Sequence, residues 1–150
     1  MQTFDPRTET NIATLCPKAQ AAARLFMAAA LPAMAAHGVV VKIICGSRTY
    51  KEQDALYAKG RSAPGPKVTN APGGYSNHNF SIAWDIGLFK GTSYLEESPL
   101  YLECARIGAS QGLDCGAFWK SFQDEPHYQL KTGLSMQQMR DRIAKGLPPA

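Results

Sequence analysis

The sequence predicts an α+β fold, a small antiparallel sheet flanked by helices, in one domain that spans residues 1–150. A chain of 150 residues has the usual size of a single domain and is long enough to bury a core. Hydrophobic residues make up 45% of the chain and charged residues 19%, which argues against disorder. Helical and strand segments do not alternate regularly, as they would in a β-α-β fold, and no internal repeat is visible.

The first long element is expected to be a helix that begins at Pro17, because proline is favoured at the first helical position. The helix runs through an alanine-rich stretch and ends at His37 and Gly38. Pro32 lies inside this stretch and should kink or break the helix, because proline removes a backbone hydrogen bond. Residues 39–45 are rich in β-branched side chains and predict a buried strand.

The rest of the chain carries clear start and stop signals for further elements. Gly60 and Gly112 end two helices, Ser135 caps the last helix, and prolines and glycines mark a loop at residues 61–75. The predicted order is helix 51–59, loop 61–75, strand 82–89, helix 99–111, strand 127–130 and helix 136–145. The last helix has one apolar face, which should pack onto the domain; contact with a membrane surface is the alternative.

Composition limits the partners of the chain. The formal charge is +4 and the isoelectric point is near 8.9, a mild bias toward anionic surfaces such as a bacterial envelope. Lysines and arginines are scattered, so we expect no nucleic-acid binding. The longest apolar stretch, residues 25–36, is too short to cross a bilayer, and the first residues contain no apolar run typical of a secretory signal. We therefore expect a soluble monomer in the cytoplasm, without stable membrane insertion.

The four cysteines are widely spaced and form no Cys-x-x-Cys motif; they are Cys16, Cys45, Cys104 and Cys115. In a cytoplasmic protein this pattern predicts reduced and mostly buried thiols. A disulfide framework or a zinc–cysteine site is a lesser alternative.

Two of the three histidines, His78 and His127, lie in short polar segments with a carboxylate nearby. Asp85 follows His78 by seven residues, inside an apolar strand, where a buried carboxylate requires a partner such as a metal or an arginine. Two imidazoles and one carboxylate are three ligands, the number that leaves tetrahedral zinc one open position. A further carboxylate could take a proton from water at such a site. The residues thus point to a zinc hydrolase.

The pattern Ser-x-His-x-x-x-x-Ala-x-Asp at residues 76–85, followed by Asp-x-Pro-His at residues 124–127, resembles the zinc D-Ala-D-Ala metallopeptidase family. The match is closest to the phage-type L-alanyl-D-glutamate endopeptidases. It keeps its order from residue 39 to residue 130 and includes segments 47–53, 56–61, 67–71, 73–79 and 119–122. The resemblance implies the fold shared by D,D-peptidases and Hedgehog domains.

The resemblance also implies roles for individual residues. His78, Asp85 and His127 would hold one zinc ion, and Asp124 would be the general base. Strand parity instead places Glu125, two residues before His127, on the same face as that histidine. However, a proline at position 126 restricts the residue before it, so the strand should begin only at the histidine and leave Asp124 in a turn.

Arg48 follows a strand, where a surface ion pair is the ordinary expectation; the resemblance instead places it in the cleft, binding a substrate carboxylate or the oxyanion. Gln53 and Ser76 are interpreted as substrate-binding or supporting residues, and Ser76 could also be only a turn residue. Ser81 replaces a glycine common in the family, so it would be strained if that backbone has a positive φ. Trp119 and Tyr75 are expected in the core rather than in the cleft.

These features predict a zinc-dependent peptidoglycan hydrolase that cuts between L-alanine and D-glutamate of the peptide stem. The expected setting is a phage endolysin, which waits in the host cytoplasm until the membrane is opened and then acts on the cell wall in the periplasm. Two alternatives remain: a D-alanyl-D-alanine carboxypeptidase with the same metal ligands, and a zinc-bearing binding module without turnover.

Overall fold

The computed structural model describes residues 1–150. Its elements are five helices, five strands and two short 3-10 helices, and their order confirms the predicted α+β class. They are α1 (Pro6–Ala13), α2 (Pro17–Ala35), β1 (Val40–Cys45), α3 (Tyr50–Ala58), η1 (Asn77–Phe80), β2 (Ala83–Lys90), β3 (Ser93–Leu95), α4 (Leu100–Ser110), β4 (Asp114–Cys115), η2 (Gly116–Phe118), β5 (His127–Gln129) and α5 (Met136–Ala144).

The strands form one antiparallel sheet in the order β1-β2-β5-β4, with β3 paired to the far end of β2. In the register of this sheet, Asp85 of β2 lies opposite Cys45 of β1 and opposite His127 of β5. The pairing is irregular between Ile43 and Cys45, which brings Cys45 rather than its neighbour opposite Asp85. Three chemically active side chains, far apart in sequence, are thus placed in one row.

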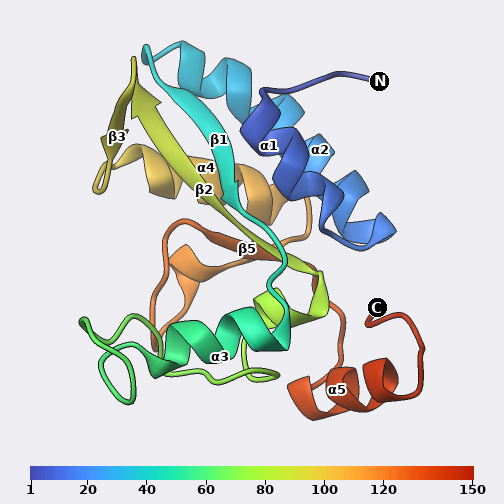
Figure 1. Ribbon diagram of the computed structural model, residues 1–150. Coiled ribbons are helices and arrows are strands. Elements are labelled where there is room, and N and C mark those ends of the chain that lie inside the picture. The colour runs from blue at the N-terminus through green and yellow to red at the C-terminus, as the bar shows by residue number, and fades with distance from the viewer.

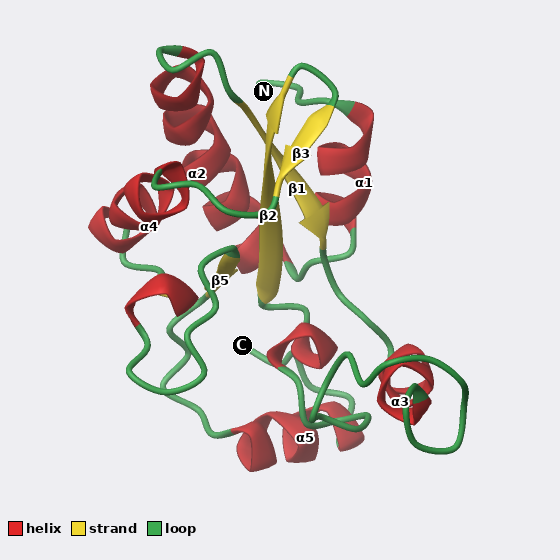
Figure 2. Ribbon diagram, turned by 90° about the vertical axis from the view of Figure 1, so that its left-hand side faces the viewer, coloured by secondary structure: helices red, strands yellow, loops and turns green.

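Helices α2 and α4 pack together along the sheet, as Figures 1 and 2 show from two directions. The core between these helices and the sheet is rich in aromatic residues. The ring centroids of Phe26 and Tyr128 are 4.5 Å apart, and Trp84 stacks on Tyr128. Because successive side chains of a strand point to opposite faces, Trp84 and Ile86 enter this core while Asp85 points to the other face. The buried aromatic residues therefore fix the direction of the Asp85 side chain.

Helix α1 was not predicted, because its sequence is mostly polar. It begins with Asp5 as N-cap and lies along the edge strand β1 (Figure 1). The Thr8 hydroxyl accepts a hydrogen bond from Ile43 N at 3.0 Å, and Asn11 donates to Ile43 O at 2.9 Å. These two side chains satisfy backbone groups that an open sheet edge would leave exposed.

The expectation that Pro32 breaks the long helix is wrong, because α2 continues through it to Ala35. Proline removes only one helical hydrogen bond, and it does so close to the end of the helix. The buried side of α2 continues past the proline to Met34, which has no exposed surface. Packing of this face against the sheet outweighs the loss of the bond.

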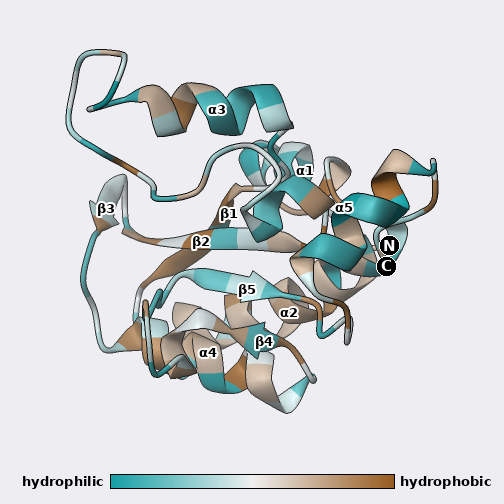
Figure 3. Ribbon diagram, turned by 90° about the horizontal axis from the view of Figure 1, so that it is seen from below, coloured by the Kyte–Doolittle hydropathy of each residue, from teal (hydrophilic) through white to brown (hydrophobic).

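Helices α3 and α5 lie beyond the end of the sheet at which β1 stops and β2 starts (Figure 1). Both carry long hydrophilic stretches, drawn in teal in Figure 3. The predicted packing of the last helix is confirmed, since Met139 of α5 is 2% exposed and lies with Phe80 and Ile82 in a small second core. No helix has the length and apolar character that crossing a bilayer requires.

Candidate metal centre and cleft

The Asp85 carboxylate lies between the two predicted histidine ligands. Its Oδ1 atom is 3.3 Å from His78 Nε2 and 3.1 Å from His127 Nδ1. Both imidazoles are 5% exposed, and their rings meet edge to face with centroids 5.0 Å apart. The structure therefore brings together the three residues that the sequence analysis named as metal ligands.

His78 comes from the 3-10 helix η1, and a capping box holds the start of that helix. Ser76 is the N-cap, and its hydroxyl accepts a hydrogen bond from His78 N at 3.3 Å. The Nδ1 atom of His78 lies 2.9 Å from the carbonyl oxygen of Gly46 and donates its proton there. This bond leaves Nε2 on the side of Asp85, as the nitrogen that a metal would bind.

Ser81 is the C-cap of η1 and has a φ of 58°, in the left-handed region. A serine in this conformation strains the turn, as expected for a positive φ at this position. The ligand on η1 keeps its place, because Asn79 of the same helix also bonds back to Arg48 O, Gly74 N and Ser76 N.

His127 is oriented through a chain of hydrogen bonds that the sequence analysis missed. Its Nε2 donates to Gln129 Oε1 at 2.7 Å, so Nδ1 faces Asp85. Gln129 in turn donates to Asp114 Oδ2 at 3.3 Å, and Trp119 Nε1 donates to Asp114 Oδ1 at 2.8 Å. Gln129 could have been found, since it follows His127 by two residues and thus shares its face of the strand. Asp114 could not, because only strand pairing places it opposite Gln129.

The charges of this cluster favour a bound cation. Burial raises the pKa of Asp85, but hydrogen bonds from His127 and His78 outweigh it and hold that pKa well below its ordinary value. Burial also lowers the pKa of His78, yet contact with Asp85 and Cys45 raises it to about 10. The carboxylate thus stabilises positive charge on His78, and a divalent metal would supply that charge instead.

The donor set fits zinc, which binds imidazole nitrogen and carboxylate oxygen. The structure contains two groups of candidate ligands, and within each group the ligand atoms all lie within 4.8 Å of one another. One group is Cys45, His78 and Asp85, and the other is Asp85, Asp124 and His127. Asp85 belongs to both. In addition, each histidine has one ring nitrogen fixed by an oxygen acceptor, the arrangement that prepares the other nitrogen for a metal.

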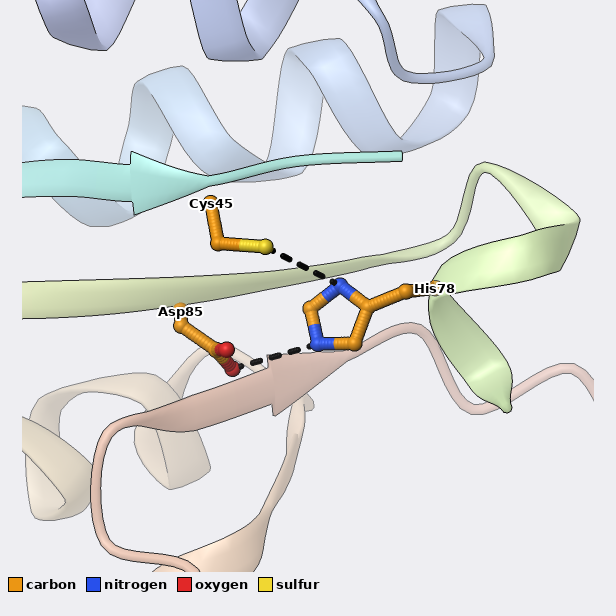
Figure 4. A group of neighbouring side chains, drawn as sticks. All are labelled: Cys45, His78 and Asp85. Atoms are coloured by element: carbon orange, nitrogen blue, oxygen red, sulfur yellow. Dashed lines mark hydrogen bonds and ion pairs between the residues drawn. The ribbon is translucent and has the colours of Figure 1, made fainter. Parts of the chain in front are cut away.

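Cys45 is a third residue of the site that the sequence analysis missed. Figure 4 shows its thiol beside His78, with Sγ 3.9 Å from Nδ1. The thiol contacts Nδ1 of the ring, whereas Asp85 contacts Nε2 of the same ring. All four cysteines are free, and burial raises the pKa of Cys104 to about 12 and that of Cys115 to about 11.

Asp124 lies in a turn immediately before β5, and its Oδ2 is 3.9 Å from His127 Nδ1. The strand begins at His127, as predicted from the proline before it. Burial raises the pKa of Asp124 above its ordinary value, and the negative charge of Asp85 raises it further. Glu125 is exposed and does not line the cleft. The geometry thus favours Asp124 over Glu125 as the proton-transfer group.

Arg48 faces the cleft and forms no ion pair, so the surface ion pair expected from its position alone is wrong. Its Nη1 donates to Gln53 Oε1 at 2.8 Å, and its Nη2 lies 3.6 Å from Cys45 Sγ. Gln53 has no exposed surface and donates to Ala71 O at 2.8 Å. The prediction that Gln53 contacts substrate is therefore corrected: it is a positioning residue for Arg48.

A cleft with a volume of about 750 Å³ opens over the three candidate ligands, His78, Asp85 and His127. Arg48, Ser76 and Asp124 line it, as the sequence analysis expected. Trp119 and Tyr75 also line it, and their predicted burial in the core is wrong. Tyr75 is 53% exposed, because its ring packs against the Arg140 guanidinium of α5, 4.2 Å away, instead of against core residues.

The chain is similar to known proteins in sequence and in fold. A family model described as D-alanyl-D-alanine carboxypeptidase matches residues 69–130. The peptidoglycan L-alanyl-D-glutamate endopeptidase CwlK of Bacillus subtilis is 39% identical over 112 residues, which is 67% of this chain and 67% of that protein. The chain therefore belongs to this family of metallopeptidases, which confirms the resemblance seen in the sequence.

Solved structures confirm the fold class. The L-Ala D-Glu endopeptidase ChiX of Serratia marcescens is 22% identical with a TM-score of 0.62, over 85% of this chain and 89% of that one. The vancomycin-resistance D,D-pentapeptidase VanY in complex with Zn(II) is 17% identical with a TM-score of 0.51, over 90% of this chain and 81% of that one.

Proposed function

We propose that this protein is a zinc-dependent peptidase that cleaves the L-alanyl-D-glutamate bond of the peptidoglycan stem. The observation that carries the proposal is the position of Asp124, 3.9 Å from His127 at the open side of the ligand cluster, with Arg48 in the same cleft. The names of two similar proteins, CwlK and ChiX, support the choice of bond.

One zinc ion would be held by His78, Asp85 and His127. When bound, zinc lowers the pKa of water and polarises a carbonyl group. The VanY structure supports this metal, because it contains Zn(II) in the same fold. The hydrogen bonds from His78 to Gly46 and from His127 to Gln129 hold the imidazoles in the ligand orientation before a metal arrives.

Asp124 would take a proton from the attacking water and return it to the departing amine. A single carboxylate can do both, because the proton that it accepts in the first step is the one that the leaving nitrogen needs in the second. The raised pKa of Asp124 favours this role, since it makes the protonated state easier to reach. Its side chain is 47% exposed and therefore accessible to water.

Arg48 would bind the free α-carboxylate of D-glutamate, next to the scissile bond. Gln53 and Cys45 hold two of its nitrogens, which fixes the plane of the guanidinium. A fixed planar guanidinium binds a carboxylate with two parallel hydrogen bonds. Stabilisation of the oxyanion is a second use of the same group.

The biological setting that we propose is phage lysis of the host. The protein would remain in the host cytoplasm as a monomeric single domain until the membrane is opened, and then reach the wall. Its charge of +4 favours contact with an anionic envelope, and we propose no nucleic-acid partner. Expression in a Gram-negative host should lyse cells only when a pore-forming protein is produced with it; lysis without such pores contradicts this setting.

The family model, which is described as a carboxypeptidase, favours a second candidate, removal of terminal D-alanine. Purified murein separates the two activities. Incubation with the protein should produce a new amino terminus on D-glutamate. Release of free D-alanine without that terminus would show that the protein is a carboxypeptidase.

The role of Asp124 is tested by the variant Asp124→Asn, with Glu125→Gln as its matched control. We expect Asp124→Asn to keep the fold and bound zinc and to lose murein clearing by at least about a hundredfold, as for a general base. Glu125→Gln should clear murein like the unchanged protein. Undiminished clearing by Asp124→Asn, with zinc bound, would remove Asp124 from this role and promote Glu125.

A further inference from the structure

Two aromatic residues that line the cleft, Trp119 and Phe122, have no role in the proposed chemistry; we call them the aromatic rim. Phe122 lines the cleft, yet it is 88% exposed. Its backbone has a φ of 54°, in the left-handed region that bulky residues rarely adopt. A large apolar side chain that is both exposed and held on a strained backbone is typical of a binding site rather than of a core.

Two hydrogen bonds join the ends of the loop that carries the Phe122 ring. Asp124 N donates to Gly116 O at 3.0 Å, and Gln123 Nε2 donates to Ala117 O at 2.8 Å. A Cβ atom at Gly116 would come within 2.2 Å of Asp124 O, so only glycine permits this closure. These bonds anchor the chain immediately after Phe122, two residues before the proton-transfer group.

Trp119 is the second aromatic residue of the rim, and it is also held in place. Its Nε1 donates to Asp114 at 2.8 Å, and its ring lies 5.1 Å from the His127 ring between centroids. The indole is half-buried and lines the cleft. It thus stands beside the metal centre with its orientation set by a hydrogen bond.

The aromatic rim and Arg48 lie on opposite sides of the candidate metal centre. A series of contacts runs from Arg48 through Cys45 to His78, on one side of the shared carboxylate. On the other side of that carboxylate, His127 contacts Trp119. A substrate that spans the centre therefore has one end near Arg48 and the other end near the rim.

We propose that Trp119 and Phe122 form a subsite for the saccharide that carries the peptide stem. The inference rests on the proposed function, in which Arg48 binds the D-glutamate carboxylate on the leaving side of the bond. The acyl side then points to the rim, and it consists of L-alanine in amide linkage to the lactyl group of N-acetylmuramic acid. The C–H groups of a pyranose ring pack on the electron-rich face of an aromatic ring.

Binding of N-acetylmuramoyl-L-alanine tests this subsite, because that ligand lacks the L-alanyl-D-glutamate bond that the protein is proposed to cleave. N-acetyl-L-alanine is the matched ligand without sugar. We expect calorimetry to give at least about tenfold tighter binding of the sugar-bearing ligand. Tryptophan fluorescence should respond to it as well, since Trp84 has no exposed surface and Trp119 is the accessible indole.

The variant Phe122→Ala should reduce the difference between the two ligands to less than about twofold, and Phe122→Tyr should retain it. Phe118→Ala is the control, because Phe118 is 49% exposed in the same loop but does not line the cleft. It should bind both ligands like the unchanged protein.

Equal affinity of the unchanged protein for the two ligands would overturn the subsite, and so would an unchanged preference in Phe122→Ala. The proposed function has a separate readout, the new D-glutamate amine released from murein. A protein that prefers the sugar-bearing ligand but releases no such amine keeps the subsite and loses the proposed function. A protein that releases the amine without that preference keeps the function alone.

Discussion

The Asp85 carboxylate is placed between two apolar neighbours, Trp84 and Ile86, yet its own side chain is 23% exposed and bonds to both imidazoles. The sequence shows these apolar neighbours, and they predict that the buried carboxylate needs a positively charged partner. The choice between a metal and an arginine could not be read from spacing. The structure speaks against the arginine, because Arg48 bonds to Gln53 and Cys45 instead of Asp85.

Asp114 provides a sharp test at the residue scale. Its carboxylate accepts bonds from Gln129 and Trp119, so the amide of Asp114→Asn would present a donor to one of them. We expect zinc affinity to fall about tenfold or more, because the orientation of His127 is lost. Competition with a chromophoric chelator measures this. Asp141→Asn, on the exposed side of α5, is the control, and equal affinities for zinc in the two variants would contradict the network.

At the scale of elements, α1 shows how tertiary contacts stabilise a helix that the local sequence does not predict. Asp5 caps the helix, and Thr8 and Asn11 bond to the backbone of β1. Helix formation in isolation is marginal for eight residues. The helix is stabilised by the strand edge that it covers, which is not visible in the local pattern.

The variant Thr8→Val should test this contact, since valine has the shape of threonine but cannot bond to Ile43 N. Thr8 has no exposed surface, so the amide would be left without a partner. We expect the free energy of unfolding to fall by about 1–3 kcal/mol in urea denaturation. Thr3→Val, at an exposed position, is the control. Equal stability of both variants would show that α1 contributes little.

The loop between η2 and β5 gives a second prediction at this scale. Gly116→Ala would place a Cβ atom against the backbone of Asp124 and push the turn outward. We expect a loss of about 1–3 kcal/mol in stability and a large loss of murein clearing. Zinc binding should persist, because His127 is held separately by Gln129. Full activity in this variant would show that the position of Asp124 is not critical.

At the scale of the whole molecule, the core and the metal centre are separate. The large core lies between the sheet and α2 and α4, whereas the ligands lie on the opposite face of β2 and in η1. Removal of metal should therefore leave a folded protein that is less stable. A ligand that binds only the folded state raises its stability with concentration.

We expect added zinc to raise the melting temperature of the unchanged protein and chelator to lower it, without loss of far-ultraviolet circular dichroism. His127→Ala should show no such dependence, because one of three ligands is missing. His37→Ala is the control, since His37 lies on the surface beside Glu103 and away from the cleft. A zinc response that survives in His127→Ala would contradict the ligand set.

Residue type and order were enough to predict the elements with strong periodicity and caps, the family, and three candidate ligands, because that information is local. The groups that support the candidate ligands became visible only in the folded chain. Cys45 and Asp114 reach the centre through strand register, Gln53 is buried behind Arg48, and the Trp119 ring turns toward the cleft. These placements depend on pairing between segments distant in the chain, and local patterns carry no record of that pairing.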